Sequence, residues 1–505
     1  MYASLPLIVH RMLCLPYLDS VHLAGYVCYV KTVFSEWVMM KQCTALVLAA
    51  GKGTRMKSRK CKVIHPVAGR PLIHYVMESL MDAGVADICV VVGHEGDAVR
   101  ESLGSFPATF VEQEPQLGTG HAVAATRSVL EGRSQNILIL CGDVPLIRPQ
   151  TLKALLQFHL ERESLLTVVT TFIEDPTGYG RIIREPSGKH ITKIVEERDA
   201  SPEEKKVKEI NTGMYVASGP LLYPLVDAVR PDNAQGEYYL TDIVEEAVKR
   251  EVAVWPYVLE RSEEALGINR RSDLAKVSRI VWGEVRQRLM DAGVTLLDPD
   301  ATYIDPTVTV GPDTVIYPCT FISGSTVIGS DCIIESGVHI MDSIVGDGVL
   351  ILQGSRLNKV VVRDGASIGP MAHLRPDSDI GSNARIGNFV EVKKTRVGEG
   401  TKASHLTYLG DSTIGKNVNI GCGTITCNYD GKKKHPTIIH DRCFVGSDVQ
   451  FVAPVEIGEG SLIGAGSTIT KDVPPRSLAV ARSRQKIYPL REDKSSGSSD
   501  EDRQA

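Results

Sequence analysis

Two patterns of hydrophobic residues divide the chain. From Thr44 to about Tyr257, short β-branched runs such as "TALVLAA" and "NILILCGD" alternate with amphipathic stretches such as "PLIHYVMESLMDAG" and "TLKALLQFHLERE". This alternation is typical of an α/β layer with a mainly parallel sheet, so we expect a Rossmann-like α/β domain. Ligands of such sheets bind at the carboxyl ends of the strands.

Beyond Leu297 a large apolar residue recurs every six positions, in three series. A period of six fits neither an α-helix nor the simple alternation of a strand. It predicts short strands and turns that wind into a parallel β-helix of stacked coils, although the spacing does not define the handedness. The three series are Ile304, Val310, Ile316, Ile322, Ile328, Ile334 and Ile340; Val362, Ile368, Leu374, Ile380, Ile386 and Val392; and Val445, Phe451, Ile457, Ile463 and Ile469.

These patterns set the expected domain limits. We expect an α/β domain over 43–270, a connecting helix within 271–297, a β-helix over 298–485 and a disordered polar tail over 486–505. Residues 1–42 are fairly apolar, but they contain neither an 18-residue uncharged run nor the features of a signal peptide. Because Met39 and Met40 stand just before the first predicted strand, we expect translation to start there and the upstream extension to be foreign to the fold.

Composition narrows the classes of function. The formal net charge is −5, with 56 Lys and Arg against 61 Asp and Glu, so the chain lacks the basic surplus of nucleic-acid-binding proteins. Small-molecule substrates are the better expectation, without stable membrane insertion. The 11 cysteines show no paired spacing pattern, which indicates reduced thiols in a cytoplasmic protein.

The stretch "LAAGKGTRM" (Leu48–Met56) follows an apolar run that we expect to be a strand. A glycine-rich loop at a strand end can point backbone N–H groups at a phosphate, and Lys52, Arg55 and Lys62 could neutralise its charge. Taken alone, the motif fits a simple tight turn about equally well. It lacks the third glycine of the dinucleotide-binding motif, and the near-match to a Walker motif, "GDSTIGKN", lies inside the six-residue repeat.

Further motifs follow in order: "EQEPQLGTGHA", "NILILCGDVPLI", "DPTGYGRI", "IVEE", "INTGMYV" and "NAQGEYYLTD". Asp143 follows a predicted strand, where a carboxylate can hold Mg²⁺ against a triphosphate. Over roughly residues 44–270 these motifs resemble the sugar-1-phosphate nucleotidyltransferase family. The resemblance is to its bifunctional N-acetylglucosamine-1-phosphate uridyltransferase/glucosamine-1-phosphate acetyltransferase members in particular.

That resemblance implies a site for UTP and N-acetylglucosamine-1-phosphate. The sugar phosphate attacks the α-phosphorus of UTP, and Arg55, Lys62 and Mg²⁺ stabilise the charge while pyrophosphate leaves. Cys61 and Cys141 stand where the family usually has Pro and Tyr. The implied substrate-binding residues are Leu48, Ala49, Ala50, Gly51, Lys62, Gln113, Gly118, Thr119, Cys141 and Gly142 for the nucleotide side, and Gly180, Glu196 and Asn211 for the sugar; the implied metal ligands are Asp143 and Asn269.

The stretch from "AHLRPDSD" to "KKKHPT" resembles the acetyltransferase half of the same enzymes. The resemblance implies a left-handed β-helix, a homotrimer with sites between subunits, and acetyl-CoA and glucosamine-1-phosphate as substrates. His405 would be the general base, because an amine attacks a thioester only when it is neutral. The implied sugar-phosphate ligands are Arg375, Lys393, Tyr408 and Asn419, and the implied acetyl-CoA ligands are Cys422, which replaces the usual Ala, Asn428, Tyr429, Ser447, Ala465 and Arg482.

Other interpretations stay open at this point. Cys422, Cys427, His435 and His440 could be read as a zinc site, although their spacing is too short for a zinc finger. The run "DGKKKHP" could be a solvated loop or could reach the CoA phosphates of a neighbouring subunit. The chain as a whole could be a uridyltransferase with a structural β-helix, or a non-catalytic regulatory subunit. We favour a bifunctional enzyme that acetylates and then uridylylates, supplying bacterial cell-envelope synthesis.

Overall fold

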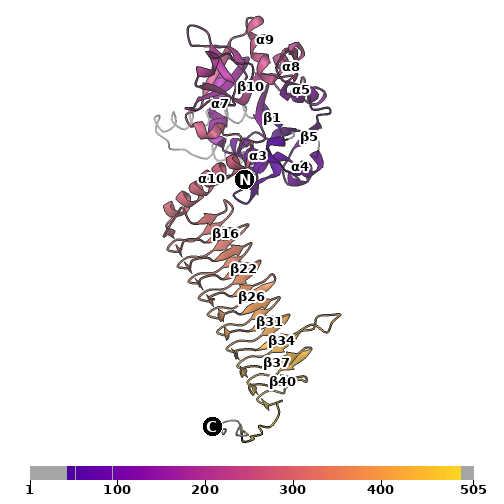
Figure 1. Cartoon of the computed structure of the whole chain (residues 1–505), viewed down its shortest axis with the longest axis vertical. Coiled ribbons are helices and arrows are strands. Elements are labelled where there is room, and N and C mark those ends of the chain that lie inside the picture. Colours follow the sequence, from indigo (N-terminus) through magenta and orange to yellow (C-terminus); the bar gives the residue numbers. More distant parts are fainter. Residues whose placement is uncertain (1–42, 52, 94, 491–505) are drawn as a thin grey trace, which may run out of the picture. The chain divides into compact units, whose positions relative to one another are not determined.

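The computed structural model describes residues 43–51, 53–93 and 95–490, which form two compact units (Figure 1). The expectations for residues 1–42 and for the end of the tail lie outside the described residues. The two units divide within helix α10 (Arg271–Asp291), after Val281. None of the described helices is both long enough and apolar enough to span a bilayer.

A nine-stranded sheet forms the centre of the first unit, with the strand order β11-β7-β10-β6-β1-β4-β5, and with β8 and β9 attached through β10. Strand β1 pairs in parallel with both β4 and β6, whereas β10 runs antiparallel to β6 and β7. The sheet is therefore mixed, and the expected parallel arrangement holds for β6-β1-β4-β5 and for β7-β11. The strands are β1 (Cys43–Leu48), β4 (Asp87–Val92), β5 (Thr109–Glu112), β6 (Asn136–Cys141), β7 (Leu166–Phe172), β8 (Arg181–Arg184), β9 (Ile191–Val195), β10 (Glu209–Ser218) and β11 (Val254–Val258).

Apolar side chains cover both faces of this sheet. Along β1, Ala45 and Val47 belong to one buried cluster and Leu46 to another, since successive strand residues point to opposite faces. Helices α3 and α7 contribute to the first cluster, and α5, α8 and α9 to the second. The helices of the unit are α3 (Leu72–Ala83), α4 (Gly96–Ser102), α5 (Thr119–Ala125), α6 (Arg127–Leu130), α7 (Pro149–Glu161), α8 (Gly219–Ala228) and α9 (Ile243–Lys249); β2 (Pro66–Val67) and β3 (Arg70–Pro71) form a small hairpin.

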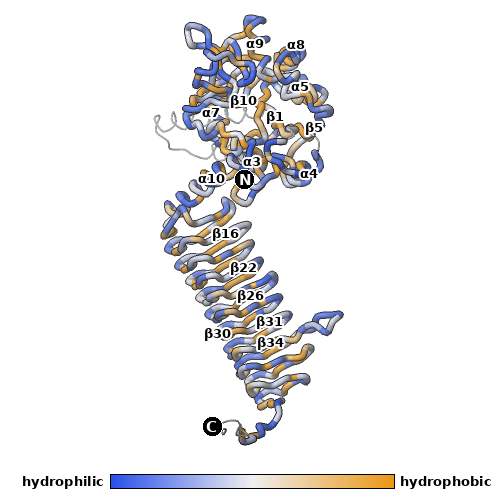
Figure 2. The backbone as a smooth tube through the Cα atoms, viewed as in Figure 1, coloured by the Kyte–Doolittle hydropathy of each residue, from blue (hydrophilic) through white to orange (hydrophobic). Residues whose placement is uncertain are grey.

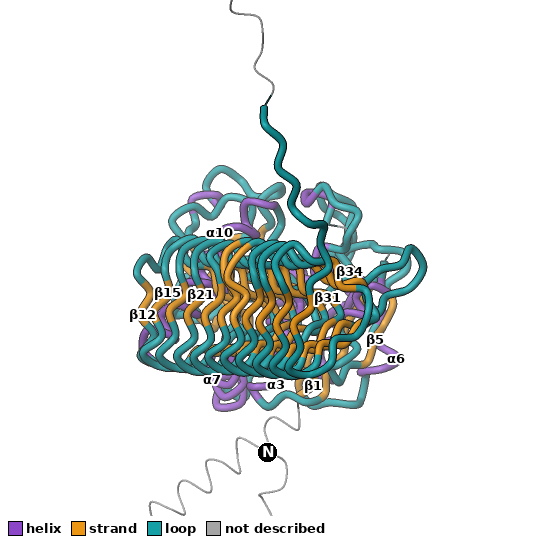
Figure 3. The backbone as a smooth tube through the Cα atoms, turned by 90° about the horizontal axis from the view of Figure 1, so that it is seen from below, coloured by secondary structure: helices purple, strands orange, loops and turns teal. Residues whose placement is uncertain are grey.

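The second unit is a parallel β-helix whose coils contribute one strand to each of three sheets; Figure 3 shows strands of successive coils lying over one another. The 11-stranded sheet contains β12 (Thr295–Leu296), β15 (Val315–Ile316), β18 (Ile333–Ile334), β21 (Leu350–Ile351), β24 (Ser367–Ile368), β27 (Arg385–Asn388), β30 (Lys402–His405), β33 (Asn419–Ile420), β36 (Phe444–Val445), β39 (Leu462–Ile463) and β41 (Leu478–Ala479).

The two other sheets complete each coil. The 10-stranded sheet contains β13 (Tyr303–Ile304), β16 (Phe321–Ser323), β19 (His339–Met341), β22 (Arg356–Asn358), β25 (His373–Leu374), β28 (Glu391–Lys393), β31 (Tyr408–Gly410), β34 (Ile425–Cys427), β37 (Gln450–Val452) and β40 (Thr468–Ile469). The remaining sheet contains β14 (Thr309–Val310), β17 (Val327–Ile328), β20 (Ile344–Val345), β23 (Val360–Val362), β26 (Ser378–Ile380), β29 (Arg396–Val397), β32 (Ser412–Ile414), β35 (Thr437–Ile439) and β38 (Val455–Ile457).

The six-residue period places an apolar side chain inside the coil from nearly every strand; in β34 the buried side chain is that of Thr426. Every member of the three predicted series is buried except Val310, which is half-buried against the same core. Figure 2 shows hydrophobic positions recurring from coil to coil along the β-helix. The phase slips where a coil has 17 residues instead of 18, as between Ile328 and its register partner Val345. One longer coil, whose contacts join residues 25 apart, carries the "DGKKKHP" segment outside the repeat.

Removing one buried member of a series should destabilise the β-helix. Ile386 is fully buried, so Ile386→Ala should lower the free energy of unfolding by about 2–5 kcal/mol through lost burial and the cavity left behind. Urea unfolding followed by circular dichroism measures this change. Arg385→Ala is the matched control, because Arg385 is exposed in the same strand and its loss should change stability by less than about 0.5 kcal/mol. Equal midpoints for the two variants would contradict the stacked core.

Candidate functional site

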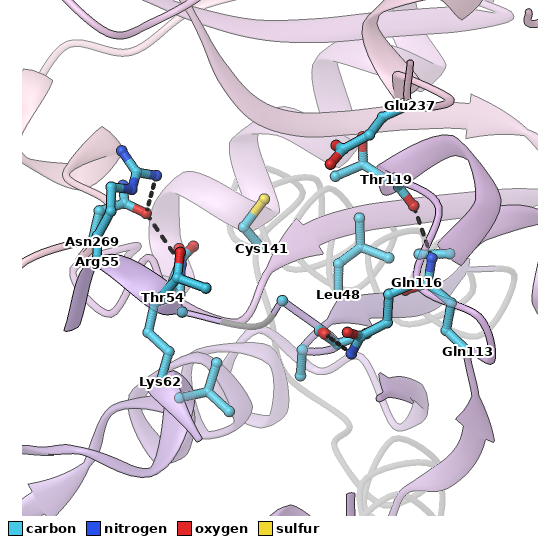
Figure 4. Close-up of a pocket in the computed structure, with 18 residues that line it drawn as sticks. Leu48, Thr54, Arg55, Lys62, Gln113, Gln116, Thr119, Cys141, Glu237 and Asn269 are labelled. Atoms are coloured by element: carbon cyan, nitrogen blue, oxygen red, sulfur yellow. Dashed lines mark hydrogen bonds and ion pairs between the residues drawn. The ribbon is translucent and has the colours of Figure 1, made fainter. Parts of the chain in front are cut away.

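A cavity of about 510 Å³ lies at the carboxyl ends of β1 and β6 (Figure 4). Parallel pairing sets Leu48 level with Val91 and Cys141, so that the loops after these strands meet at one edge of the sheet. Of the predicted residues, Leu48, Ala49, Ala50, Gly51, Arg55, Lys62, Gln113, Gly118, Thr119, Cys141, Asp143 and Asn269 line the cavity. The cavity lining also includes Gly53, Thr54, Val63, Gln116, Ala122 and Glu237.

Charged and amide groups cluster on one side of this cavity. The Lys62 ammonium forms an ion pair with Asp143 and donates to Asn269 Oδ1 at 3.3 Å. Arg55 Nη2 donates to the same oxygen at 2.9 Å. The side-chain oxygens of Asp143 and Asn269, which are far apart in the sequence, thus both lie within reach of Lys62 Nζ. Such a pair suits a hard divalent cation that takes its remaining ligands from phosphates and water.

The opposite side of the cavity presents amide side chains (Figure 4). Gln113 Nε2 donates to the Gly118 carbonyl at 2.9 Å, and Gln116 Nε2 donates to the Ala50 carbonyl at 2.5 Å. Thr119 Oγ1 accepts the Leu240 N–H at 3.0 Å, which ties the first residue of α5 to the segment before α9. Gln116 and Glu237 are not among the predicted ligands, although they lie in the motifs "EQEPQLGTGHA" and "NAQGEYYLTD".

Gly142 does not line the cavity but allows its two principal strands to end side by side. Its N–H donates to the Leu48 carbonyl at 2.9 Å, and a Cβ at this position would approach the Leu48 carbonyl oxygen to 3.2 Å. The residue type is therefore explained by close backbone approach. Asp143 follows immediately and is held at the mouth of the cavity.

The three predicted sugar ligands lie together, outside the residues that line the cavity. The Asn211 N–H donates to the Gly180 carbonyl at 2.9 Å, and a Cβ on Gly180 would lie 3.3 Å from a Glu196 carboxylate oxygen. Asn211 Nδ2 donates to the Tyr215 hydroxyl at 2.8 Å. Cys141 connects this group to the cavity, because its thiol contacts the Gly213 carbonyl at 3.5 Å.

Carboxylates near this group are partly dehydrated. Burial, together with the charges of Asp242 and Asp199, raises the pKa of Glu196. Burial and the nearby Glu245 and Asp199 raise the pKa of Asp242 to about 6. A half-buried carboxyl that is held in this way suits hydrogen bonding to a neutral sugar hydroxyl better than contact with a phosphate.

In the β-helix, one column of turns collects the predicted general base and four of the six predicted acetyl-CoA ligands. We call it the His405 corner; it comprises the turns 405–406, 422–423, 447–448 and 465–466, each of which follows a strand of the 11-stranded sheet. Backbone hydrogen bonds stack the turns: Gly423 N–H to Leu406 O at 3.0 Å, Asp448 N–H to Cys422 O at 2.7 Å and Gly466 N–H to Ser447 O at 2.8 Å. Arg482 extends the column by donating to the Ala465 carbonyl at 2.8 Å.

A second column of turns follows the strands of the 10-stranded sheet and carries the predicted phosphate ligands. We call it the Lys393 corner; it comprises Arg375, Lys393 and Asp411, and its turns are joined by the Asp411 N–H to Lys393 carbonyl bond at 3.0 Å. Asn428 Nδ2 donates to Asp411 at 2.6 Å and lies 3.5 Å from the Tyr408 hydroxyl. Tyr408 belongs to β31, the strand between the two corners.

The "DGKKKHP" segment adds a cation to the Lys393 corner within the same chain. The backbone of Lys434 pairs with that of Tyr429 in an isolated antiparallel β-bridge, and Tyr429 is 61% exposed. The ammonium of Lys434 lies beside the ammonium of Lys393 and lowers the pKa of Lys393. Arg375 is held by Glu391 at 2.7 Å. Positive charges gathered in this way favour an anionic ligand.

Asn419 is the predicted ligand that does not join these columns. It begins β33 in the 11-stranded sheet, in register with Lys402 and Phe444, whereas Lys393 and Tyr408 belong to the 10-stranded sheet.

The zinc interpretation fails on geometry: His435 pairs with Asp430 at 2.7 Å and His440 with Glu456 at 2.6 Å. Across residues 43–51, 53–93 and 95–490, no three His, Cys, Asp or Glu side chains are grouped as metal ligands.

Comparisons with known proteins agree with this two-part architecture. A family model described as the MobA-like NTP transferase domain matches residues 45–200, and one described as bacterial transferase hexapeptide (six repeats) matches residues 359–394 and 436–471. The "Bifunctional protein GlmU" of Geotalea daltonii is 52% identical over 88% of this chain and 98% of the relative; that of Pelobacter propionicus is 51% identical over 88% and 97%. The chain belongs to the GlmU family.

Membership of the GlmU family defines the class of protein. The chain is an enzyme with a nucleotidyltransferase domain followed by a hexapeptide-repeat acetyltransferase domain, and its substrates are small molecules. The predicted fold class is confirmed, since the parallel coils and hexapeptide repeats agree with a left-handed β-helix. Nucleotidyl transfer of this kind generally requires a divalent metal ion.

Thiol reactivity tests the environment of the cavity. Burial and the neighbouring Asp143 carboxylate raise the pKa of Cys141 to about 12, so its thiolate fraction at pH 8 should be about 10⁻⁴. Iodoacetamide at pH 8 should therefore modify the exposed Cys319 and Cys427 well before Cys141, as followed by peptide mass spectrometry. Raising the pH to 10 should accelerate labelling of Cys141. Early labelling of Cys141 at pH 8 would contradict the described environment.

Proposed function

We propose that this chain makes UDP-N-acetylglucosamine in two steps. Acetyl-CoA first acetylates glucosamine-1-phosphate in the β-helix, and UTP then reacts with N-acetylglucosamine-1-phosphate in the α/β domain. The observation that carries the proposal is the presence of two separate sets of residues, one around Asp143 and the other along the two corners of the β-helix. We assign uridylyl transfer to 43–270, acetyl transfer to 298–485 and the connection to 271–297.

Uridylyl transfer requires two anions to approach each other. Lys62 and Arg55 lie on the charged side of the cavity, where their positive charges would offset those of the triphosphate and of the attacking sugar phosphate. Asp143 and Asn269 are the residues that would hold Mg²⁺, which supplies further charge neutralisation when it is bound. Because Lys62 already contacts both oxygens, we expect its ammonium to shift toward the phosphates when nucleotide and metal enter.

The uracil and the sugar would occupy different ends of this site. Gln113, Gly118 and Thr119 present polar groups on the side opposite Lys62, which suits a neutral base. The group formed by Gly180, Glu196 and Asn211 lies beyond Cys141 and offers a carboxyl and an amide to sugar hydroxyls. The attacking phosphate would then lie between them, near Lys62 and Arg55, so that catalysis is mainly positioning and electrostatic stabilisation.

Acetyl transfer needs a base for the amine of the sugar. The amine nitrogen attacks the thioester carbonyl carbon, the C–N bond forms, the C–S bond breaks and CoA leaves as its thiol. His405 is exposed at the end of β30, where it can take the proton that the nitrogen loses. Arg375 and Lys393 at the neighbouring corner would hold the phosphate, and Tyr408 lies between them and His405.

The His405 corner offers an extended track for acetyl-CoA. Cys422, Ser447, Ala465 and Arg482 follow His405 coil by coil, so a long ligand could lie along the column with its thioester near the base. The buried Asn428 and the exposed Tyr429 lie at the Lys393 corner instead, where Asn428 contacts Asp411 and Tyr408. Asn419 lies in the 11-stranded sheet, whereas Lys393 and Tyr408 lie in the 10-stranded sheet, and this separation supports a homotrimer in which a neighbouring copy completes each acetyl-transfer site. We place the enzyme in the cytoplasm, where it would supply cell-envelope synthesis.

Two substitutions should separate the activities. Asp143→Ala should abolish uridylyl transfer, measured as pyrophosphate release, and leave acetyl transfer intact. His405→Ala should lower kcat for acetyl transfer, measured as CoA release, by about 10²–10⁴-fold and leave uridylyl transfer intact.

The control variants replace the same residue types, aspartate and histidine, at exposed positions outside the two proposed sites. Asp82→Ala alters an exposed aspartate of α3, and His440→Ala alters an exposed histidine of the same β-helix; both variants should retain both activities. Loss of both activities in His405→Ala would show that His405 supports the fold. If the unaltered protein releases no CoA, the chain is a uridyltransferase with a structural β-helix.

A further inference from the structure

The imidazole of His405 contacts the side chain of Asn388, which has no role in the proposed reaction as described so far. His405 Nδ1 lies 2.6 Å from Asn388 Oδ1, in the coil before it, 17 residues earlier in the chain. The two residues are register partners at the ends of β30 and β27. Asn388 is half-buried and His405 is exposed, so the ring stays accessible to solvent while its Nδ1 contacts the amide.

The backbone around this pair is held on both sides. Leu406 N–H donates to the Asn388 carbonyl at 3.0 Å, and Thr407 Oγ1 donates to the His405 carbonyl at 2.7 Å. The preceding Gly387 allows the coils to approach closely, because a Cβ there would overlap the Ser404 carbonyl. The ring and the amide therefore meet through the geometry of the coil rather than through a flexible surface contact.

We propose that Asn388 is a positioning residue that selects the catalytic tautomer of His405. The inference rests on the proposed role of His405 in acetyl transfer. A neutral imidazole has one N–H and one lone pair. When Nδ1–H donates to the Asn388 oxygen, the lone pair is on Nε2, on the ring edge that points away from Asn388. That nitrogen is then ready to accept the proton of the sugar amine.

The same contact remains useful after proton transfer. The imidazolium that forms has an N–H on both nitrogens, and Nδ1–H can keep donating to the amide oxygen without reorganisation. The bond also limits rotation of an exposed ring, which otherwise samples several rotamers. Asn388 therefore acts through His405 and does not touch the substrate.

Two variants at this position test the proposal in the full-length chain. Asn388→Ala removes the acceptor and should lower kcat for acetyl transfer by about tenfold or more, with little change in KM for glucosamine-1-phosphate. Asn388→Asp keeps an oxygen at this place and should restore kcat to within about threefold at high pH. Its carboxylate stabilises the imidazolium, so the acid limb of the pH profile of kcat should move to higher pH.

Internal and matched controls separate this role from a structural one. Uridylyl transfer by the same preparation should stay unchanged in both variants. Arg385→Ala, an exposed change in the same strand, should leave the acetyl-transfer rate and its pH profile as in the unaltered protein.

Two results would overturn the assignment. One is an unchanged kcat in Asn388→Ala; the other is an Asn388→Asp variant that is folded and active in uridylyl transfer, yet shows neither recovery nor a shifted pH profile. Absence of acetyl transfer from the unaltered protein would instead reject the proposed function on which the assignment rests.

Discussion

Parallel strand pairing in fixed register is the constraint on which both halves of the molecule depend. In the α/β unit it sets the ends of β4, β1 and β6 level, so that loops from residues far apart in sequence enclose one cavity. In the β-helix it sets each turn on the turn of the coil before, so that residues 17 or 18 positions apart share a corner. Coils of 17 and 18 residues keep the same strand register, so differences in length are taken up by the turns.

In both sites, cationic side chains lie close together, and neighbouring carboxylate or amide oxygens offset part of the repulsion between them. Lys62 and Arg55 share the Asn269 oxygen, and Lys62 also pairs with Asp143. At the Lys393 corner, Arg375 has Glu391 as a partner, while Lys393 and Lys434 face each other. In the proposed reactions both sites bind anionic sugar phosphates, and each site would gain stability when a phosphate replaces repulsion between cations with attraction.

Much of this could be predicted from the sequence, because it depends on local patterns. The six-residue period alone identifies the coils, since most strands place one apolar residue inside, as Ile368, Leu374 and Ile380 do. The loop residues around Gly51 follow directly from a strand-end motif. What the pattern does not contain is the length of each turn. The contacts between His405 and Asn388, between Lys434 and Lys393, and between Lys62 and Asn269 depend on turn lengths and on tertiary approach, so only the structure reveals them.

Whether one chain contains both sites is tested most directly by a single reaction that contains the purified chain, glucosamine-1-phosphate, acetyl-CoA, UTP and Mg²⁺. The products are identified by mass spectrometry. We expect UDP-N-acetylglucosamine together with free CoA and pyrophosphate, and no nucleotide sugar when acetyl-CoA is omitted. Formation of UDP-N-acetylglucosamine only when N-acetylglucosamine-1-phosphate is supplied ready-made would contradict the claim that one chain contains both sites.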